Sequence, residues 1–356
     1  MEAVKGRGAG LNMVSRFAHQ NREAIDDGWG QGGAEIAGVT KKPKTVIHIE
    51  TVKSTLVFNQ SPDIGFDRSI NTYRGCEHGC TYCYARPNHA YVGLSPGLDF
   101  ETQIFAKPDA AKRLRVELAA SNYQCAPVNI GSVTDAYQPI ERELGITREV
   151  LQVLEQTNHP LIIVTKSSLI ERDIDILSRM AARNLVIVLI SVTSLDGELS
   201  RLLEPRAAAP WRRLKTISRL AQAGIPTHIS LAPVIPFVNE PEIEKILRAG
   251  KDAGALGAHY VVLRLPHEVK VLFRDWLQQH MPDRADRVMH RIQQMRGGKD
   301  NDASFSSRMK GEGLWAQLIK RRFELAVKQC GLSRQKQSLD CNLFDASSLS
   351  AQGSLF

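Results

Sequence analysis

Cys76, Cys80 and Cys83 are the side chains whose type and spacing most clearly indicate chemistry. Three residues separate the first pair and two separate the second, directly after an apolar run at residues 69–72. The start of the chain carries a lysine but no apolar stretch typical of a secretory signal, so we expect free thiols and not disulfides. The spacing therefore predicts a cysteine loop (residues 76–83) that binds a metal centre through thiolates.

Two kinds of metal centre fit three thiolates on one loop. A closed zinc site needs a fourth ligand, which His78 or His89 would supply. A four-iron cluster held by three cysteines leaves one iron open to a substrate or cofactor. Gly75 and Gly79 allow the backbone to bend around a bulky cluster, and the spacing favours the cluster. We interpret the remaining cysteines, which form no pair with ligand spacing, as structural or incidental thiols: Cys125, Cys330 and Cys341.

Six apolar runs of strand length indicate how the cysteine loop is positioned. They are rich in isoleucine and valine, as in strands buried on both faces of a parallel sheet, and they span 69–72, 128–133, 161–165, 185–192, 227–233 and 259–265. Stretches of helical period lie between them at 108–120, 147–156, 170–182, 211–223 and 240–253. Six β/α units predict a doubly wound sheet or an incomplete β/α barrel. No Gly-x-Gly-x-x-Gly follows the first strand, which disfavours a dinucleotide-binding fold.

The composition is that of a globular protein. Hydrophobic residues make up 43% and charged residues 24% of the 356 residues, which excludes a mainly disordered or fibrous chain. The longest strongly apolar run, 185–192, is too short to span a bilayer. We therefore expect a cytoplasmic protein without a membrane partner.

The cysteine loop resembles the signature of the radical S-adenosylmethionine (SAM) superfamily. Cys-x-x-x-Cys-x-Tyr-Cys after the first strand of a six-unit β/α domain is a specific signal of that superfamily. The flanking residues and later motifs resemble its DNA repair photolyase-like branch, which includes spore photoproduct lyase. Within that branch, the runs 61–64, 74–80 and 93–97 resemble those of uncharacterised bacterial proteins. The resemblance covers residues 54–323 and implies an incomplete (β/α)6 barrel of the TIM type.

The resemblance also implies cofactors and the residues that hold them. The three cysteines would hold a [4Fe-4S] cluster whose open iron binds SAM, and reductive cleavage of SAM would yield a 5′-deoxyadenosyl radical. Tyr82 matches the aromatic residue that packs near the adenine, although it can also be a simple packing residue. The positions that contact SAM in spore photoproduct lyase correspond here to Thr134, Lys166 and Ser191. A lysine after a buried strand needs an anion, and the SAM carboxylate would serve.

Two further positions bear on the chemistry. Arg206 follows the fourth strand, where it would clamp a carboxylate or a substrate phosphate, or else form a surface salt bridge with Glu204. Ser132 occupies the position of the hydrogen-donating cysteine of spore photoproduct lyase. Because a hydroxyl O–H bond is too strong to donate a hydrogen atom as a thiol does, we do not expect identical chemistry, and the hydrogen donor stays open.

Charge and composition divide the chain into four parts. Residues 1–53 are expected to be an extension, mobile or draped over other residues, and 54–265 the radical SAM core. Residues 266–336 are expected to be a basic helical appendage, and 337–356 a flexible tail. The net charge is +8, and residues 264–336 hold 16 lysines and arginines against 8 aspartates and glutamates. A confined surplus of this kind favours a nucleic-acid partner, with a solvated basic face as the alternative.

The end of the tail resembles the peptide by which bacterial replication and repair proteins bind the DNA sliding clamp. Leu355 and Phe356 would be the apolar anchors and Gln352 the polar contact, although Gly353 stands where leucine is more usual. The expected electron donor is a flavodoxin or ferredoxin. Together these features predict a radical SAM enzyme that acts on nucleic acid or in DNA repair. The alternatives are a radical SAM enzyme for a small molecule or protein side chain, and a non-catalytic metal-binding module.

Overall fold

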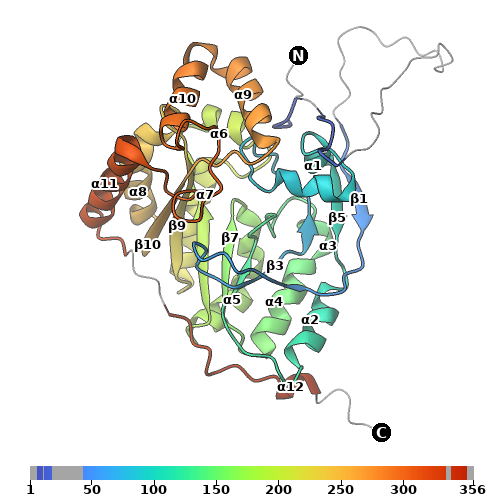
Figure 1. Ribbon diagram of the computed structural model, residues 1–356. Helices are drawn as coiled ribbons and strands as arrows, with labels where there is room; N and C mark the ends of the chain where they lie inside the picture. Colours follow the sequence, from blue (N-terminus) through green and yellow to red (C-terminus); the bar gives the residue numbers. More distant parts are fainter. Residues whose placement is uncertain (1–5, 11, 18–42, 334–337, 351–356) are drawn as a thin grey trace, which may run out of the picture.

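The computed structural model describes residues 6–10, 12–17, 43–333 and 338–350. At its centre lies a seven-stranded sheet in the order β10-β9-β8-β7-β6-β3-β2 (Figure 1). The short edge strand β2 pairs antiparallel with β3, and the other six strands run parallel. The strands are β2 (Leu56–Phe58), β3 (Arg68–Ile70), β6 (Val128–Ile130), β7 (Leu161–Thr165), β8 (Val186–Ser191), β9 (Thr227–Val234) and β10 (Gly257–Val262).

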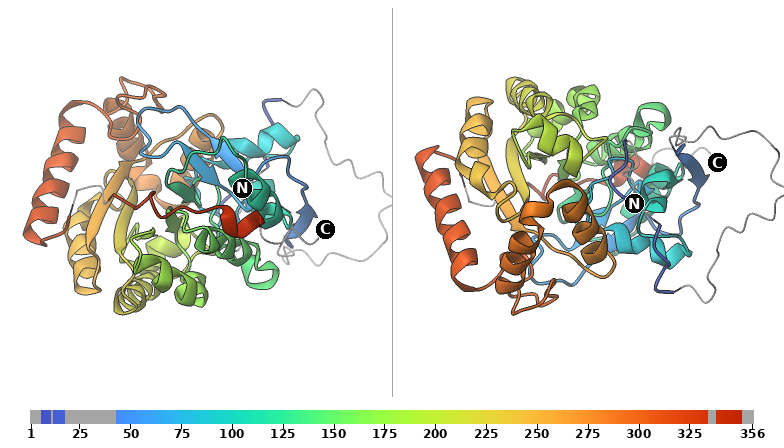
Figure 2. Two further views of the ribbon diagram at one scale, coloured as in Figure 1. Left: turned by 90° about the horizontal axis from the view of Figure 1, so that it is seen from below. Right: turned by 90° about the horizontal axis from the view of Figure 1, so that it is seen from above.

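Helices cover the outside of this curved sheet, as the views from below and above show (Figure 2). They connect consecutive parallel strands and comprise α2 (Ala110–Leu118), α4 (Ile146–Gln156), α5 (Ile174–Ala181), α7 (Pro210–Gln222) and α8 (Ile243–Asp252). Strand residues such as Val188 and Leu231 are fully buried because side chains pack on both faces of the sheet. The six parallel strands and their helices confirm the predicted incomplete barrel.

Shorter elements complete the chain around the sheet. A small second sheet consists of β1 (Val46–Ile49), β5 (Gln103–Ala106) and β4 (Tyr73–Arg74), in the order β1-β5-β4. The short helices are η1 (Arg86–Val92), α1 (Asp99–Thr102), α3 (Glu141–Leu144), η2 (Ser168–Asp173), α6 (Gly197–Leu203), η3 (Glu240–Glu242) and α12 (Ser347–Ser350). No helix among the described residues has the length and apolar character needed to cross a bilayer.

The predicted basic appendage divides in two. The helices α9 (Val269–His280) and α10 (Pro282–Gln294) build a separate hydrophobic cluster through residues such as Phe273 and Val288. The helix α11 (Gly313–Gln329) packs instead on β10 and α8, and the ring centroid of Phe323 lies 4.6 Å from that of Tyr260. Phe323 belongs to the main core, so α11 is part of the barrel although it follows residue 265.

The predicted tail is packed over most of its length. Residues 338–349, here called the C-terminal strap, run along the amino-terminal end of the strands (Figure 1). The amide of Asp340 donates to the carbonyl of Asn184 at 3.0 Å, and that of Asp345 donates to Thr157 at 3.0 Å. Leu349 packs against the main core. Gln352, Leu355 and Phe356 lie outside the described residues.

Candidate functional site

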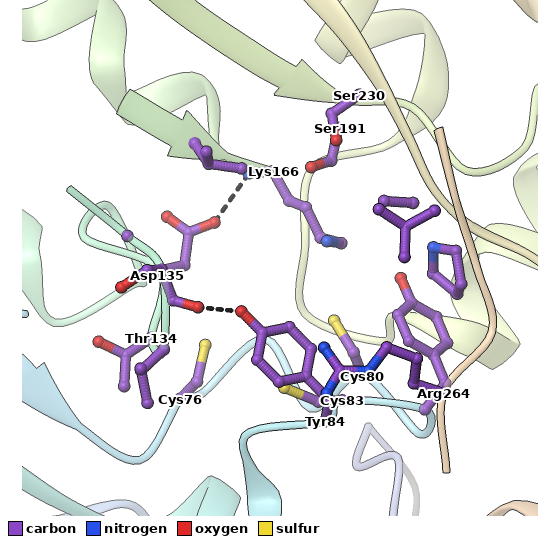
Figure 3. A pocket seen from close by; sticks show the side chains of 18 of the residues that line it. Cys76, Cys80, Cys83, Tyr84, Thr134, Asp135, Lys166, Ser191, Ser230 and Arg264 are labelled. Atoms are coloured by element: carbon purple, nitrogen blue, oxygen red, sulfur yellow. Dashed lines mark hydrogen bonds between the residues drawn. The ribbon is translucent and has the colours of Figure 1, made fainter. Parts of the chain in front are cut away.

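A pocket of about 290 Å³ opens at the carboxyl ends of the parallel strands, where a β/α barrel places its chemistry. The cysteine loop forms one end of it, and the residues that follow each parallel strand form its walls (Figure 3). The residues that line it include Cys76, Cys80, Cys83, Tyr82, Tyr84, Ser132, Thr134, Asp135, Lys166, Ser191, Ser230 and Arg264. The structure therefore brings together residues that are up to 245 positions apart, from Ile64 to Met309.

The cysteine loop is fixed by backbone hydrogen bonds to three other segments. The amide of Cys76 donates to Phe100 at 2.9 Å, and that of Thr81 donates to Leu203 at 3.0 Å. The amide of Glu77 donates to the side-chain oxygen of Gln138 at 2.9 Å. Gly75 has a φ of +79°, a left-handed conformation that residues with a Cβ rarely adopt. Contacts with α1, α6 and the segment after β6 therefore fix the conformation of the cysteine loop.

A buried carboxylate joins the loop to the N-terminal segment (residues 6–10 and 12–17). Glu101 forms an ion pair with Arg86 at 2.5 Å, and both side chains are fully buried. Its oxygens also accept hydrogen bonds from the amides of Gly8 at 3.0 Å and Ala9 at 2.9 Å. The guanidinium of Arg7 donates to the carbonyl of Glu101 at 2.8 Å. Of the predicted extension, residues 6–10 and 12–17 are therefore draped over the cysteine loop, whereas Val46–Ile49 form β1 of the small sheet.

The donor set fits an iron–sulfur cluster better than a single metal ion. Cys76, Cys80 and Cys83 all line the same end of the pocket. Within the described residues, no three side chains of cysteine, histidine, aspartate or glutamate converge closely enough to hold one metal ion. Of the two histidines considered for zinc, His89 uses Nε2 to contact the carbonyl of Gln103 at 2.9 Å. A closed zinc site needs a fourth ligand, whereas a four-iron cluster can be held by three thiolates on one loop, so the donor set favours the cluster.

Lys166 presents a cation to the pocket from the end of β7. Its ammonium lies 5.9 Å from the ring centroid of Tyr82, and no described carboxylate is at ion-pair distance from it. Burial alone would lower the pKa of Lys166, but the charges of Cys80 and Glu204 raise it above its ordinary value. A partly buried, charged ammonium with no carboxylate at ion-pair distance fits the carboxylate of SAM.

A buried polar network supports Tyr82 and the wall beside Lys166. Glu204 accepts hydrogen bonds from the hydroxyl of Tyr82 and from Thr193, the latter at 2.8 Å. It also pairs with Arg213, and both charged groups are buried. Burial would raise the pKa of Glu204, but Arg213 and Lys166 lower it, so the carboxylate stays ionised. Tyr82 is thereby held in a single orientation against the pocket.

Asp135 organises the ends of β6 and β7. Its carboxylate accepts a hydrogen bond from the backbone amide of Lys166 at 2.7 Å and another from the hydroxyl of Thr165 at 2.7 Å (Figure 3). Nδ1 of His78 lies 3.3 Å away without hydrogen-bond geometry. Burial opposes ionisation, but the charge of His78 and these hydrogen bonds lower the pKa of Asp135 to about 2. Asp135 therefore positions the backbone that carries Lys166.

Of the other candidate cofactor-binding residues, two line the pocket and one does not. Thr134 and Ser191 both line the pocket, and the hydroxyl of Thr134 donates to the carbonyl of Tyr73 at 3.2 Å. Arg206 does not line the pocket. It pairs with Glu77 at 3.0 Å and not with Glu204, which the other network occupies.

Two pocket residues escaped sequence reasoning. Tyr84 directly follows the third cysteine, and its hydroxyl donates to the carbonyl of Ser132. Arg264 follows β10, and its guanidinium lies 5.4 Å from the ring centroid of Tyr84. A charged residue inside the apolar run 261–265 was a signal for Arg264, because such a residue stands at a strand end where the pocket opens.

The fold and the cysteine site define a radical SAM enzyme, and comparison with protein families agrees. The family described as the radical SAM superfamily matches residues 70–250, and the chain belongs to this superfamily. Members of this superfamily use a [4Fe-4S] cluster and SAM, which are therefore the cofactors of this protein.

Individual relatives cover most of the chain. It is 31% identical over 287 residues to an uncharacterised protein of Mycobacterium tuberculosis, an alignment that covers 76% of this chain and 84% of the relative. It is 27% identical over 196 residues to an uncharacterised protein of Methanocaldococcus jannaschii, covering 55% and 71%. Spore photoproduct lyase complexed with dinucleoside spore photoproduct has a similar fold, with a TM-score of 0.55, 15% identity and coverage of 80% of both chains.

Proposed function

We propose that this radical SAM enzyme acts on nucleic acid or in DNA repair. The observation that carries the proposal is a set of cations without carboxylate partners on two helices, α10 and α11. The helix α10 lies on the pocket side of the barrel, and α11 lies along the side of the barrel (Figure 1). Arg284 on α10 and Lys320 and Arg321 on α11 are exposed, and no described carboxylate forms an ion pair with them. Phosphate backbones are the usual partners of such a surface.

Aromatic side chains interleave with these cations. The guanidinium of Arg287 lies 4.1 Å from the ring centroid of Phe237, and that of Arg291 lies 4.0 Å from the ring of Trp315. The two rings are in edge contact at 5.7 Å. Stacked rings and guanidinium groups suit bases and phosphates together. Spore photoproduct lyase, which shares the fold, has been solved with a dinucleoside photoproduct, and this supports a nucleic-acid substrate.

The residues of the pocket would divide the work of the reaction. When bound, the [4Fe-4S] cluster supplies the electron that cleaves SAM and starts the radical chemistry of this family. The three cysteines would hold the cluster, and Lys166 would orient SAM through its carboxylate. Tyr82, fixed by Glu204, would pack against the adenine, while Thr134 and Ser191 would contribute polar contacts. The pocket wall excludes water from the reacting atoms, which protects a reactive intermediate from side reactions.

A small-molecule or protein substrate is the alternative, and the size of the pocket favours it. A volume of about 290 Å³ is near the lower limit for sites that enclose a drug-sized ligand. A nucleic acid would therefore have to present one nucleotide with its phosphate to the pocket while the rest of its backbone lies on the surface outside.

Isotope tracing distinguishes these substrates. The reconstituted enzyme is incubated anaerobically with SAM, a chemical reductant and DNA carrying deuterium in its sugars and bases, and 5′-deoxyadenosine is analysed by mass spectrometry. Deuterium in the 5′-deoxyadenosine supports a DNA substrate, and the Cys76→Ala variant is the control for cluster dependence. Uncoupled formation of unlabelled 5′-deoxyadenosine, together with salt-insensitive or absent DNA and RNA binding, would favour the alternative.

We further propose that a small one-electron donor, a flavodoxin or ferredoxin, reduces the cluster in place of the chemical reductant. Replacing the reductant by either protein with its reductase should support the formation of 5′-deoxyadenosine. If neither protein supports it while the chemical reductant does, the donor belongs to another class.

A further inference from the structure

Arg264 is a cation in the pocket that the protein leaves largely unsatisfied. It lines the pocket after β10, and its Nε atom is buried without a hydrogen-bond partner. Its only hydrogen bond within the described part of the chain is a weak one from Nη1 to the sulfur of Met309 at 3.6 Å. A guanidinium has five N–H donors, so most of the donor capacity of Arg264 is unused.

The charges around Arg264 do not neutralise it. The carboxylate that influences the pKa of Arg264 is Asp63, which forms a two-pronged ion pair with Arg308, at 2.5 Å for each oxygen. Arg264, Arg308 and Asp63 together therefore carry one net positive charge. No carboxylate in the described residues forms an ion pair with Arg264. Burying a charge without a counter-charge is costly, which indicates that an anion completes this group.

Other buried arginines nearby show what a purely structural arginine looks like here. Arg296 donates to the backbone carbonyls of Ser307, Val262 and Leu263 at 2.7–3.3 Å. Arg213 pairs with the buried Glu204. Nε of Arg296 also lacks a partner, but the guanidinium groups of both arginines are engaged by fixed acceptors of the protein. Arg264 instead faces the pocket and the ring of Tyr84.

We infer that Arg264 forms a subsite for a phosphate group of the substrate. The inference rests on the proposed function and names the part of a nucleic acid that the pocket holds. Lys166 already serves the SAM carboxylate from the wall opposite, next to Cys80, so the second cation is available for another anion. A guanidinium binds a phosphate in two-pronged fashion.

The surroundings of Arg264 fit a nucleotide. Tyr84 lies under its guanidinium, and Phe66 and Ile64 line the same pocket. Aromatic and apolar side chains next to a phosphate subsite provide a surface on which a base can stack. The subsite would thus fix the phosphate while the adjoining nucleotide reaches toward the cysteine end of the pocket.

Binding measurements with the reconstituted full-length enzyme test the subsite. Fluorescence anisotropy with a labelled single-stranded oligothymidylate, over a range of salt, compares the native chain with Arg264→Gln and Arg264→Lys. Arg264→Gln should weaken binding about tenfold and reduce the slope of log affinity against log salt by about 0.7, the contribution of one phosphate contact to a single strand. Arg264→Lys should keep the slope. Arg113→Gln, on the outer surface of α2, is the matched control and should change neither quantity. Unchanged binding by Arg264→Gln overturns the inference.

A chemical footprint separates failure of the subsite from failure of the proposed function. Phenylglyoxal modifies arginines, and peptide mass spectrometry reports the extent at Arg264 and at Arg113. Thymidylyl-thymidine and inorganic phosphate should both protect Arg264, whereas thymidine, which lacks phosphate, should not. Protection by inorganic phosphate with no protection by the dinucleotide and no oligonucleotide binding would retain the phosphate subsite and refute the nucleic-acid function. If neither the dinucleotide nor inorganic phosphate protects Arg264, the subsite is refuted.

Discussion

Four of the six cysteines of the chain illustrate two kinds of environment. Cys76, Cys80 and Cys83 face the pocket, whereas Cys330 ends α11 and packs against the barrel core. We therefore expect Cys76→Ala to lose the four-iron cluster while keeping its circular dichroism, because the barrel core is separate from the loop. Iron and sulfide analysis after anaerobic reconstitution measures this, with Cys330→Ala as the matched control. A full iron content in Cys76→Ala would contradict the ligand assignment.

Lys166 offers a second prediction for a single side chain. If its ammonium holds the SAM carboxylate, Lys166→Gln removes a hydrogen bond to a charged group, worth about 1.5–3 kcal/mol. SAM affinity should fall by a factor of about 10–150, because each 1.4 kcal/mol corresponds to a factor of ten. Equilibrium dialysis with the reconstituted enzyme measures the affinity, and the iron content should stay unchanged. Equal SAM affinity in both proteins would assign Lys166 another role.

The N-terminal segment shows how a whole element depends on one close approach. A Cβ on Gly8 would lie 1.7 Å from the carbonyl oxygen of Gly79 and 2.9 Å from its carbon. Because backbone atoms cannot move aside, Gly8→Ala should push the segment off the cysteine loop. It would break the two hydrogen bonds from Gly8 and Ala9 to the carboxylate of Glu101, a loss of about 3–6 kcal/mol.

The expected result for Gly8→Ala is faster loss of iron to a chelator and stronger proteolysis within residues 6–17. Gly197→Ala is the matched control, since nothing lies within 4 Å of a Cβ at that position. If Gly8→Ala releases iron at the rate of the native chain, the segment does not stabilise the cysteine loop.

The strands of the barrel could be predicted from sequence because their pattern is local. Residues 185–190 form an unbroken apolar run, and β8 (Val186–Ser191) covers most of it. The pairing of β1 with β5 could not be predicted, since half-exposed strands of four residues carry no distinctive pattern. The same limit applies to the site. The cysteine spacing identifies the cluster loop from sequence alone. The lack of a carboxylate partner for Arg264 depends on which residues the fold brings next to it, and the sequence does not show this.

The C-terminal strap packs against a buried histidine, His159. His159 contacts the carbonyl of Pro160 through Nδ1 at 3.0 Å and the hydroxyl of Tyr123 through Nε2 at 2.6 Å. The ring of Phe344, in the strap, lies against it at 5.4 Å. Burial lowers the pKa of His159 from 6.5 to about 4, despite the hydrogen bond to Pro160.

The sign of the resulting pH effect follows from proton binding. Between pH 6.5 and pH 4 the unfolded chain binds a proton at this site and the folded chain does not, so stability falls as pH falls. The loss of folding free energy caused by His159 reaches about 3 kcal/mol below pH 4. Denaturant unfolding from pH 7 to pH 4 should show a shallower pH dependence for His159→Gln than for the native chain. Identical pH dependence in the two proteins would exclude His159 as a source.

At the scale of the whole molecule, the pocket and the C-terminal strap lie at opposite ends of the barrel. The pocket opens where the parallel strands end, and the strap crosses where they begin, next to Asn184 and Thr157 (Figure 1). A reaction in the pocket and the binding of a partner protein near the C-terminal strap would therefore not obstruct each other. A partner held through the chain end after Leu349 therefore leaves the pocket open to substrate.

This separation gives the proposed sliding-clamp contact a clear test. Deletion of residues 352–356, or Leu355→Ala with Phe356→Ala, should abolish binding to the DNA sliding clamp in surface plasmon resonance, because the apolar anchors are lost. Cluster content and SAM affinity should stay unchanged, since the strap ends far from the cysteines along the strands. Leu343→Ala, an exposed leucine of the strap, is the matched control and should still bind the clamp. Undiminished clamp binding after the deletion would show that the chain end is not the contact.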